Sequence, residues 1–206
     1  MKKAKAVFAV ALILLLHSFL WLSLKGVIQK IEQENGVMEN YQVINLFLGI
    51  ALWIWALRRS RFRADKILFA GLALFSGTIL ILEVDFRQMN APLLNAIING
   101  KIRDLWLGTL WLVGIIFFVR NAKPVLNAFL SWLRTPAAVL MFAAGAFWIT
   151  SALIDKSLLG RKDLFNEELM EVNATLLMTA SALLNLYTQN RQPSPGYTPE
   201  PAALIL

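Results

Sequence analysis

The chain has 206 residues, of which 58% are hydrophobic and 16% are charged, whereas an ordinary soluble domain has about 25% charged residues. Its net charge of +7 would suit nucleic acid, but the basic residues lie between long uncharged blocks, where the topology-setting charges of membrane proteins are found. The absence of cysteine excludes disulfides, thiolate nucleophiles and thiolate metal sites. We therefore predict an integral membrane protein. Its expected partners are membrane lipids and other membrane proteins, and not nucleic acid.

The N-terminal segment predicts a retained transmembrane helix. A basic start, Met1-Lys2-Lys3-Ala4-Lys5, is followed by 19 uncharged residues, 6–24. A secretory signal peptide begins in the same way, but its apolar region has about 7–15 residues and precedes a small-x-small cleavage site. The run in this chain is longer and no such site follows it.

Five further apolar runs complete a predicted all-α, polytopic membrane helix bundle with about six transmembrane helices. The fourth run of the chain has only 15 residues, so the sequence leaves open whether it spans a membrane that needs about 20 residues. The last run is expected to begin as helix several residues before its first apolar residue. The five runs are residues 41–57, 67–82, 105–119, 135–154 and 173–187.

Three segments between and after these runs are not predicted to span the membrane. Residues 88–103 are too polar to span and predict a loop or a short interfacial helix. Residues 121–134 predict an amphipathic helix on the membrane surface, because their apolar residues recur at helical spacing. Residues 188–206 contain four prolines and predict a disordered cytoplasmic tail, which leaves residues 1–187 as the transmembrane domain. The apolar positions of the amphipathic segment are Val125, Leu126, Phe129, Leu130 and Leu133.

The distribution of charge predicts the orientation. With six spans and the N-terminus inside, the inner segments hold 12 of the 20 basic residues. The positive-inside rule then favours a bacterial inner-membrane protein with both termini in the cytoplasm. The acids follow the opposite trend, because 11 of the 13 lie outside and only Asp65 and Glu200 lie inside. The inner basic residues are Lys2, Lys3, Lys5, Arg58, Arg59, Arg61, Arg63, Lys66, Arg120, Lys123, Arg134 and Arg191.

Several outer acids stand at the predicted ends of the spans, and small or polar residues follow them along the same helix faces into the membrane. Glu168 and Glu171 share a helical face with Thr175 and Thr179, and Glu39 shares one with Gln42. A charge carried into hydrocarbon is costly unless it is paired or hydrated, so these acids indicate a function. We predict that four helices turn these faces toward one outward-opening carboxylate pocket. The candidate residues are Glu39, Glu83, Asp85, Asp155, Glu168 and Glu171.

Helix capping is the competing explanation for some of these acids. Glu39, Glu167, Glu168 and Asp104 stand at predicted helix N-termini, where a carboxylate complements the helix dipole by about 0.3–1 kcal/mol. Acids at helix C-termini oppose the dipole, which leaves Glu83, Asp85 and Asp155 unexplained by capping. Glu171 lies deepest in its span and is the strongest single candidate.

A set of oxygen ligands at Glu83, Asp85 and Glu171 would suit Ca²⁺ or Mg²⁺ and would disfavour zinc. The sequence makes no other cofactor prediction. The only histidine, His17, cannot supply the usual multi-histidine zinc set, and we expect it to be a hydrogen-bonded packing residue.

Three short acidic motifs resemble those of a group of bacterial multi-span membrane proteins of unassigned function. These motifs are Glu34-Asn35-Gly36-Val37-Met38-Glu39, Glu83-Val84-Asp85-Phe86 and Glu167-Glu168-Leu169-Met170-Glu171. The arrangement is also distantly similar to ceramidase- and adiponectin-receptor-like membrane hydrolases. The zinc histidines of those enzymes are absent from this chain, which speaks against metal-dependent hydrolysis.

Three functions fit the predicted pocket. The first is a non-enzymatic protein that binds a cation, a lipid headgroup or a partner helix. The second is a lipid-modifying or hydrolytic enzyme that uses Glu171 with Glu83 or Asp85 as acid and base, although no catalytic residue set can be assigned. The third is a cation- or proton-coupled carrier. It is the weakest of the three, because many carriers contain internal repeats and this sequence contains no recognisable one.

Overall fold

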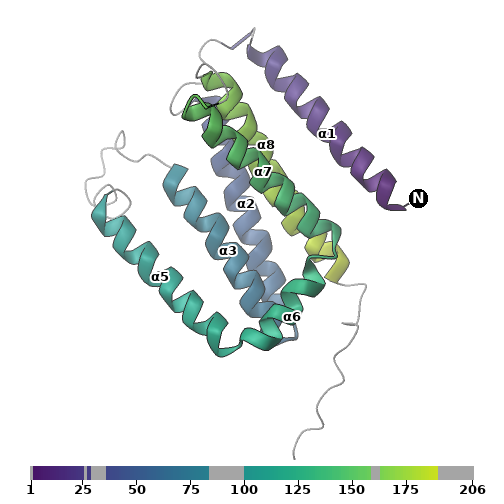
Figure 1. Ribbon diagram of the computed structural model, residues 1–206. Coiled ribbons are helices and arrows are strands. Elements are labelled where there is room, and N and C mark those ends of the chain that lie inside the picture. The colour runs from purple at the N-terminus through teal and green to yellow at the C-terminus, as the bar shows by residue number, and fades with distance from the viewer. Residues whose placement is uncertain (1, 26, 29–35, 84–99, 159–162, 190–206) are drawn as a thin grey trace, which may run out of the picture.

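The computed structural model describes residues 2–25, 27–28, 36–83, 100–158 and 163–189, and this part of the chain is a bundle of α-helices without a strand (Figure 1). The predicted all-α class is confirmed. The helices are α1 (Lys2–Lys25), α2 (Val37–Arg59), α3 (Arg63–Glu83), α5 (Lys101–Arg120), α6 (Ala122–Trp132), α7 (Pro136–Asp155) and α8 (Leu164–Gln189).

Five of these helices, α2, α3, α5, α7 and α8, are long and apolar enough to cross a membrane. Helix α5 extends the short run 105–119 at both ends and has 20 residues, which correspond to about 30 Å of helix, the thickness of the hydrocarbon core. Only 6% of its apolar 18-residue stretch is buried inside the protein, as expected for a helix that faces lipid. In α1, the residues whose side chains are described form a shorter apolar helix, Val10–Lys25. The chain is therefore consistent with an integral membrane protein.

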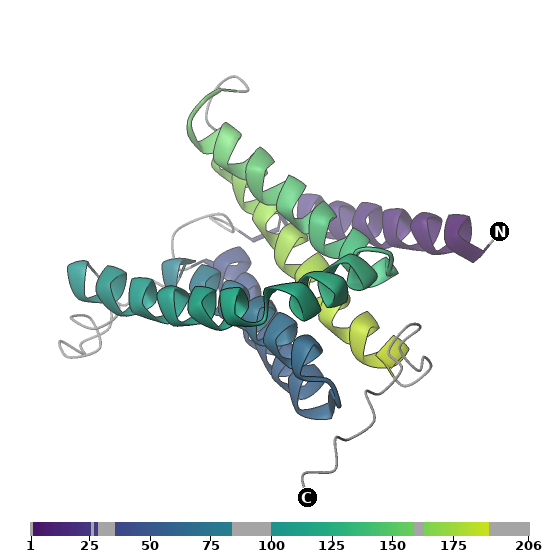
Figure 2. The same ribbon diagram turned by 60° about the horizontal axis from the view of Figure 1, so that its bottom comes forward.

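Helix α8 is the centre of the bundle. It contacts α7, α2 and α1 (Figures 1 and 2). Of its apolar 18-residue stretch, 61% is buried inside the protein. The expectation that this helix begins before its apolar run is confirmed, since it starts at Leu164. It ends at Gln189, two residues beyond the predicted end of the transmembrane domain. Residues 190–206, the predicted disordered tail, lie outside the described residues.

Small residues allow the helices beside α8 to approach closely. Ala137 and Ala144 of α7 are fully buried, and the Ser181 hydroxyl of α8 donates a hydrogen bond to the Ala137 carbonyl at 2.7 Å. On α2, a Cβ atom placed on Gly49 would lie 3.3 Å from Thr179 Oγ1 and 3.7 Å from Thr179 Cα. A larger residue at position 49 would therefore push α2 away from the backbone of α8.

The buried apolar residues form three layers along the bundle. The layer at the end where α2 finishes and α3 begins contains the largest fully buried side chain, Trp53. Its ring stacks on Phe69 with 5.9 Å between centroids and meets Trp132 edge-on at 6.5 Å. The middle layer is Leu46, Leu80, Leu140, Ala144, Ala174, Leu177 and Met178, and the layer at the other end is Trp21, Met38, Phe165, Leu169 and Val172.

Helix α6 crosses the lower end of the bundle between α5 and α7 (Figure 1). The helix predicted in this segment is present, and one side of it packs against the bundle. Val125 and Trp132 are buried against the bundle, whereas Leu126 and Leu130 are about half exposed. The apolar surface of α6 is broad enough to contact both the protein and the surroundings, so the repeat of apolar residues alone did not identify Trp132 as a core residue.

Candidate functional site

The alternating directions of the helices gather the acidic residues at one end of the bundle. Helices α2 and α8 begin at this end with Glu39 and Glu168, whereas α3 and α7 finish there with Glu83 and Asp155. Glu83 interacts electrostatically with Glu39 and Glu171 across three helices, and Asp155 interacts with Glu171. Five of the six candidate residues are thus brought together. The sixth, Asp85, lies outside the described residues.

Gln42 of α2 joins the two carboxylates of α8. Its side-chain nitrogen Nε2 donates to Glu168 Oε2 at 2.7 Å and lies 3.4 Å from Glu171 Oε2. This contact requires Glu168 and Glu171 to share one face of α8, which their spacing of three residues ensures. We call Gln42, Ser151, Glu83, Glu168 and Glu171 the carboxylate cluster.

Ser151 of α7 completes the contacts around Glu171. Its hydroxyl donates to Glu171 Oε1 at 2.6 Å, a length typical of a charge-assisted hydrogen bond. Glu171 therefore accepts hydrogen bonds from two neighbouring helices. These contacts place Glu171 in a polar network between three helices, which helix capping does not explain.

The carboxylate cluster keeps acceptor capacity that its neighbours do not use. Gln42 is fully buried, and its carbonyl oxygen Oε1 has no hydrogen-bond partner among the described residues. Since each carboxylate can accept about four hydrogen bonds, the amide and hydroxyl donors of the cluster satisfy only part of the acceptors of Glu168 and Glu171. A buried acceptor without a donor costs about 1–3 kcal/mol, so a ligand that supplies donors would be stabilised here.

No basic side chain of the described residues neutralises Glu83, Glu168 or Glu171. The one salt bridge found in the described part of the chain joins Arg103 and Asp104 at 3.0 Å and includes none of these three carboxylates. Lys25, at the end of α1, lies over the ring of Phe165, 4.0 Å from its centroid. The cluster therefore carries an excess of acceptors and of potential negative charge.

A second polar network connects α1 to α8. Asn173 donates through Nδ2 to the Ser18 hydroxyl at 3.1 Å, so its Oδ1 is the acceptor for His17 Nδ1 at 2.8 Å. His17 Nε2 in turn accepts from Trp21 Nε1 at 3.1 Å. Both ring nitrogens of His17 are therefore engaged in hydrogen bonds, Nδ1 as donor and Nε2 as acceptor. The expectation that His17 is a hydrogen-bonded packing residue is confirmed.

The described residues offer no preformed metal centre. No group of three or more histidine, aspartate or glutamate side chains among them is arranged to hold a metal ion. The predicted Ca²⁺ or Mg²⁺ site used Glu83, Glu171 and Asp85, and the last of these is outside the described part, so that site stays a prediction.

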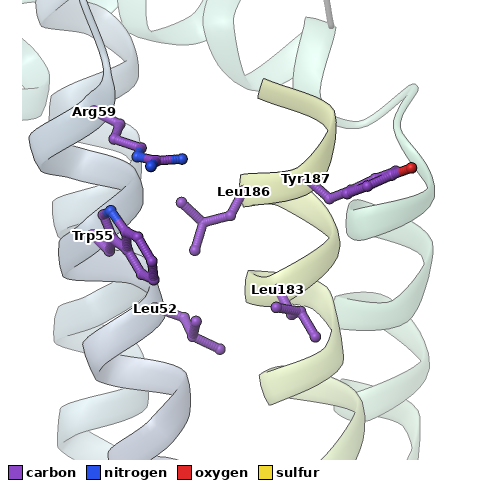
Figure 3. Close-up of a pocket in the computed structure, with 6 residues that line it drawn as sticks. All are labelled: Leu52, Trp55, Arg59, Leu183, Leu186 and Tyr187. Carbon is purple, nitrogen blue, oxygen red and sulfur yellow. The ribbon is translucent and has the colours of Figure 1, made fainter. Parts of the chain in front are cut away.

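A shallow apolar pocket lies at the opposite end of the bundle, between α2 and α8 (Figure 3). Its volume is about 200 Å³, and Leu186 points from α8 toward α2. The Arg59 guanidinium sits over the Trp55 ring, 4.9 Å from the ring centroid, and is held there by a cation–π contact. The pocket presents few polar groups and does not involve the acids, so it does not compete with the carboxylate cluster as a site of polar chemistry.

Sequence reasoning placed Gln42 on the helix face that carries Glu39 but assigned it no role. The signal that could have identified Gln42 is its position three residues after Glu39 on the same face of α2. Comparison of the chain with protein-family models, with curated proteins and with solved structures finds no match. The candidate function therefore rests on the geometry of the cluster.

Proposed function

We propose that this protein is a non-enzymatic integral membrane protein that binds a cation in its carboxylate cluster, and that the cation is an ammonium group. The observation that carries this proposal is the Gln42 bridge between Glu168 and Glu171, with a buried Oε1 atom that has no described partner. An ammonium group supplies positive charge and three N–H donors, which match carboxylate and amide acceptors.

The proposed orientation places the carboxylate cluster on the outer side of a bacterial inner membrane, with both termini in the cytoplasm. The basic residues of the described helix ends support this orientation, because Arg58, Arg59 and Arg63 stand at the end opposite the cluster. Such segregation of Lys and Arg is typical of the cytoplasmic side. A ligand would then reach the cluster from outside the cell.

An enzymatic use of the same residues is less well supported. Ser151 and Glu171 have the contact of a nucleophile and its base, with 2.6 Å between oxygen atoms. However, the only histidine, His17, is hydrogen-bonded to Asn173 and Trp21 in the second network, so no imidazole is available beside Ser151 to pass on its proton. We therefore assign the Ser151 hydroxyl a role in holding Glu171.

Calorimetric titration of the purified full-length protein with ethylammonium chloride tests the proposal. We expect saturable binding, weakened about tenfold or more in Glu171→Gln, because one charge-assisted hydrogen bond is worth about 1.5–3 kcal/mol. Asp104→Asn is the matched control, since Asp104 pairs with Arg103 outside the cluster and its replacement should leave the affinity unchanged.

Tetramethylammonium has the same charge as ethylammonium but no N–H donor, so we expect it to bind more weakly. No measurable binding of ethylammonium, or equal affinity in Glu171→Gln, would contradict the proposal. Tighter binding of Ca²⁺ or Mg²⁺ than of ethylammonium would replace the ammonium assignment with the metal site predicted from the sequence.

A further inference from the structure

A groove between α3 and α5 opens at the end of the bundle opposite the carboxylate cluster. Its volume is about 470 Å³, within the range of about 300–1,000 Å³ found for small-molecule sites. The two helices are joined above the groove by a hydrogen bond from Trp111 Nε1 to Thr78 Oγ1 at 3.0 Å. Below it they are connected through α6, which contacts both helices. The groove is therefore framed at both ends by contacts within the protein.

The wall of the groove combines apolar side chains with small residues. Gly71 of α3 and Gly114 of α5 face it, and Phe118 contributes an aromatic surface near its lower end. A Cβ atom on Gly71 would meet no other atom within 4 Å, so space lies directly over this residue. This surface suits a hydrocarbon chain better than a polar ligand.

The groove ends in two basic residues, Arg63 and Lys66, in the first turn of α3. Both side chains are exposed, and neither forms a salt bridge with a residue in the described part of the chain. The neighbouring acid Asp65 is directed toward the Ser60 hydroxyl, 3.5 Å away. Positive charge at the mouth of an apolar groove is complementary to a ligand with an anionic head and an apolar tail.

We propose that the groove between α3 and α5 binds an anionic phospholipid. Arg63 and Lys66 would hold the phosphate, and one acyl chain would lie along the groove toward Trp111. The dimensions agree with this occupant. From Arg63 to Leu74 α3 rises about 16 Å, close to half of the hydrocarbon thickness of about 30 Å, which is the depth of one leaflet. Basic pockets between transmembrane helices on the cytoplasmic side are known to suit anionic headgroups.

This site does not depend on the proposed cation binding, because it lies at the other end of the bundle and uses none of the same residues. A helix of a partner protein is a less suitable occupant, since it would leave Arg63 and Lys66 facing an apolar surface. The preference for an anionic lipid should fall as salt is raised, because the exposed charges are screened.

Native mass spectrometry of the full-length protein with dioleoyl phosphatidylglycerol and dioleoyl phosphatidylcholine tests the proposal. We expect the wild-type protein to retain phosphatidylglycerol preferentially, and the double variant Arg63→Gln/Lys66→Gln to lose about tenfold in affinity for it. Arg59→Gln is the matched control, because Arg59 is held over Trp55 in the smaller pocket and its replacement should leave the preference intact.

Gly71→Leu tests the acyl chain separately. The space over Gly71 admits a larger side chain, and leucine is a better helix former than glycine, so the variant should fold and should retain both lipids less well. An unchanged preference for phosphatidylglycerol in the double variant would overturn the proposal. So would equally tight binding of glycerol 3-phosphate that Gly71→Leu does not affect, because that result would indicate a simple anion site.

Discussion

Replacing Trp53 by alanine is expected to lower the free energy of unfolding by about 3–5 kcal/mol, as for other fully buried aromatic residues. Trp53 has no exposed surface and holds together the layer formed by α2, α3 and α6 through Phe69 and Trp132. Its removal would leave a cavity that the surrounding helices cannot fill. Reversible unfolding of the purified protein in mixed detergent micelles measures the loss.

Trp55→Ala provides the matched control on the same helix, two residues away. Trp55 is 51% exposed, so its truncation removes few contacts inside the protein and should cost about 1 kcal/mol or less. Equal losses for the two variants would contradict the proposed packing of α2, because they would mean that Trp53 is not more buried than Trp55.

Replacing Gln42 by leucine is expected to lower the free energy of unfolding by about 3 kcal/mol. Leucine has a similar volume, so the loss comes from the hydrogen bonds to Glu168 and Glu171, which are worth about 1.5–3 kcal/mol each when the acceptor is charged. The contact to Glu171 is long at 3.4 Å, and we assign it the smaller share. The same unfolding measurement applies.

A double-mutant cycle separates this effect from a general disturbance of the core. When Glu168 and Glu171 are both replaced by glutamine, Gln42→Leu should cost at least 1 kcal/mol less than in the wild-type protein, because the carboxylate acceptors are gone. If the cost is the same in both backgrounds, Gln42 acts through packing alone and the bridge has no energetic role.

Much of the fold was predictable because hydrocarbon imposes strict requirements on sequence. The long apolar helices and the helix that became α6 follow from the length of the apolar runs and from the spacing of their apolar residues. The grouping of the acids at one end also followed, because successive antiparallel helices return their alternate ends to the same side.

The contacts between helices were not predictable to the same degree. The pairing of Gln42 with Glu168 depends on the rotation of α2 against α8, which is set by Gly49 and by the hydrogen bond from Thr179 to the Asn45 carbonyl. A single sequence fixes which residues share a face of one helix, but it does not determine the neighbour that this face meets. For the same reason Asn173 was not identified as the partner of His17.

Binding of an external cation requires the carboxylate cluster to lie on the outer side of the membrane. Single-cysteine variants test this directly, because the chain has no cysteine of its own. Lys156→Cys places a thiol at the acidic end, one residue after α7, and Lys123→Cys places one at the basic end, in α6. A membrane-impermeant maleimide applied to intact spheroplasts should label Lys156→Cys and should label Lys123→Cys only after permeabilisation. Labelling of Lys123→Cys in intact spheroplasts, with Lys156→Cys protected, would place the cluster in the cytoplasm and contradict the proposed function.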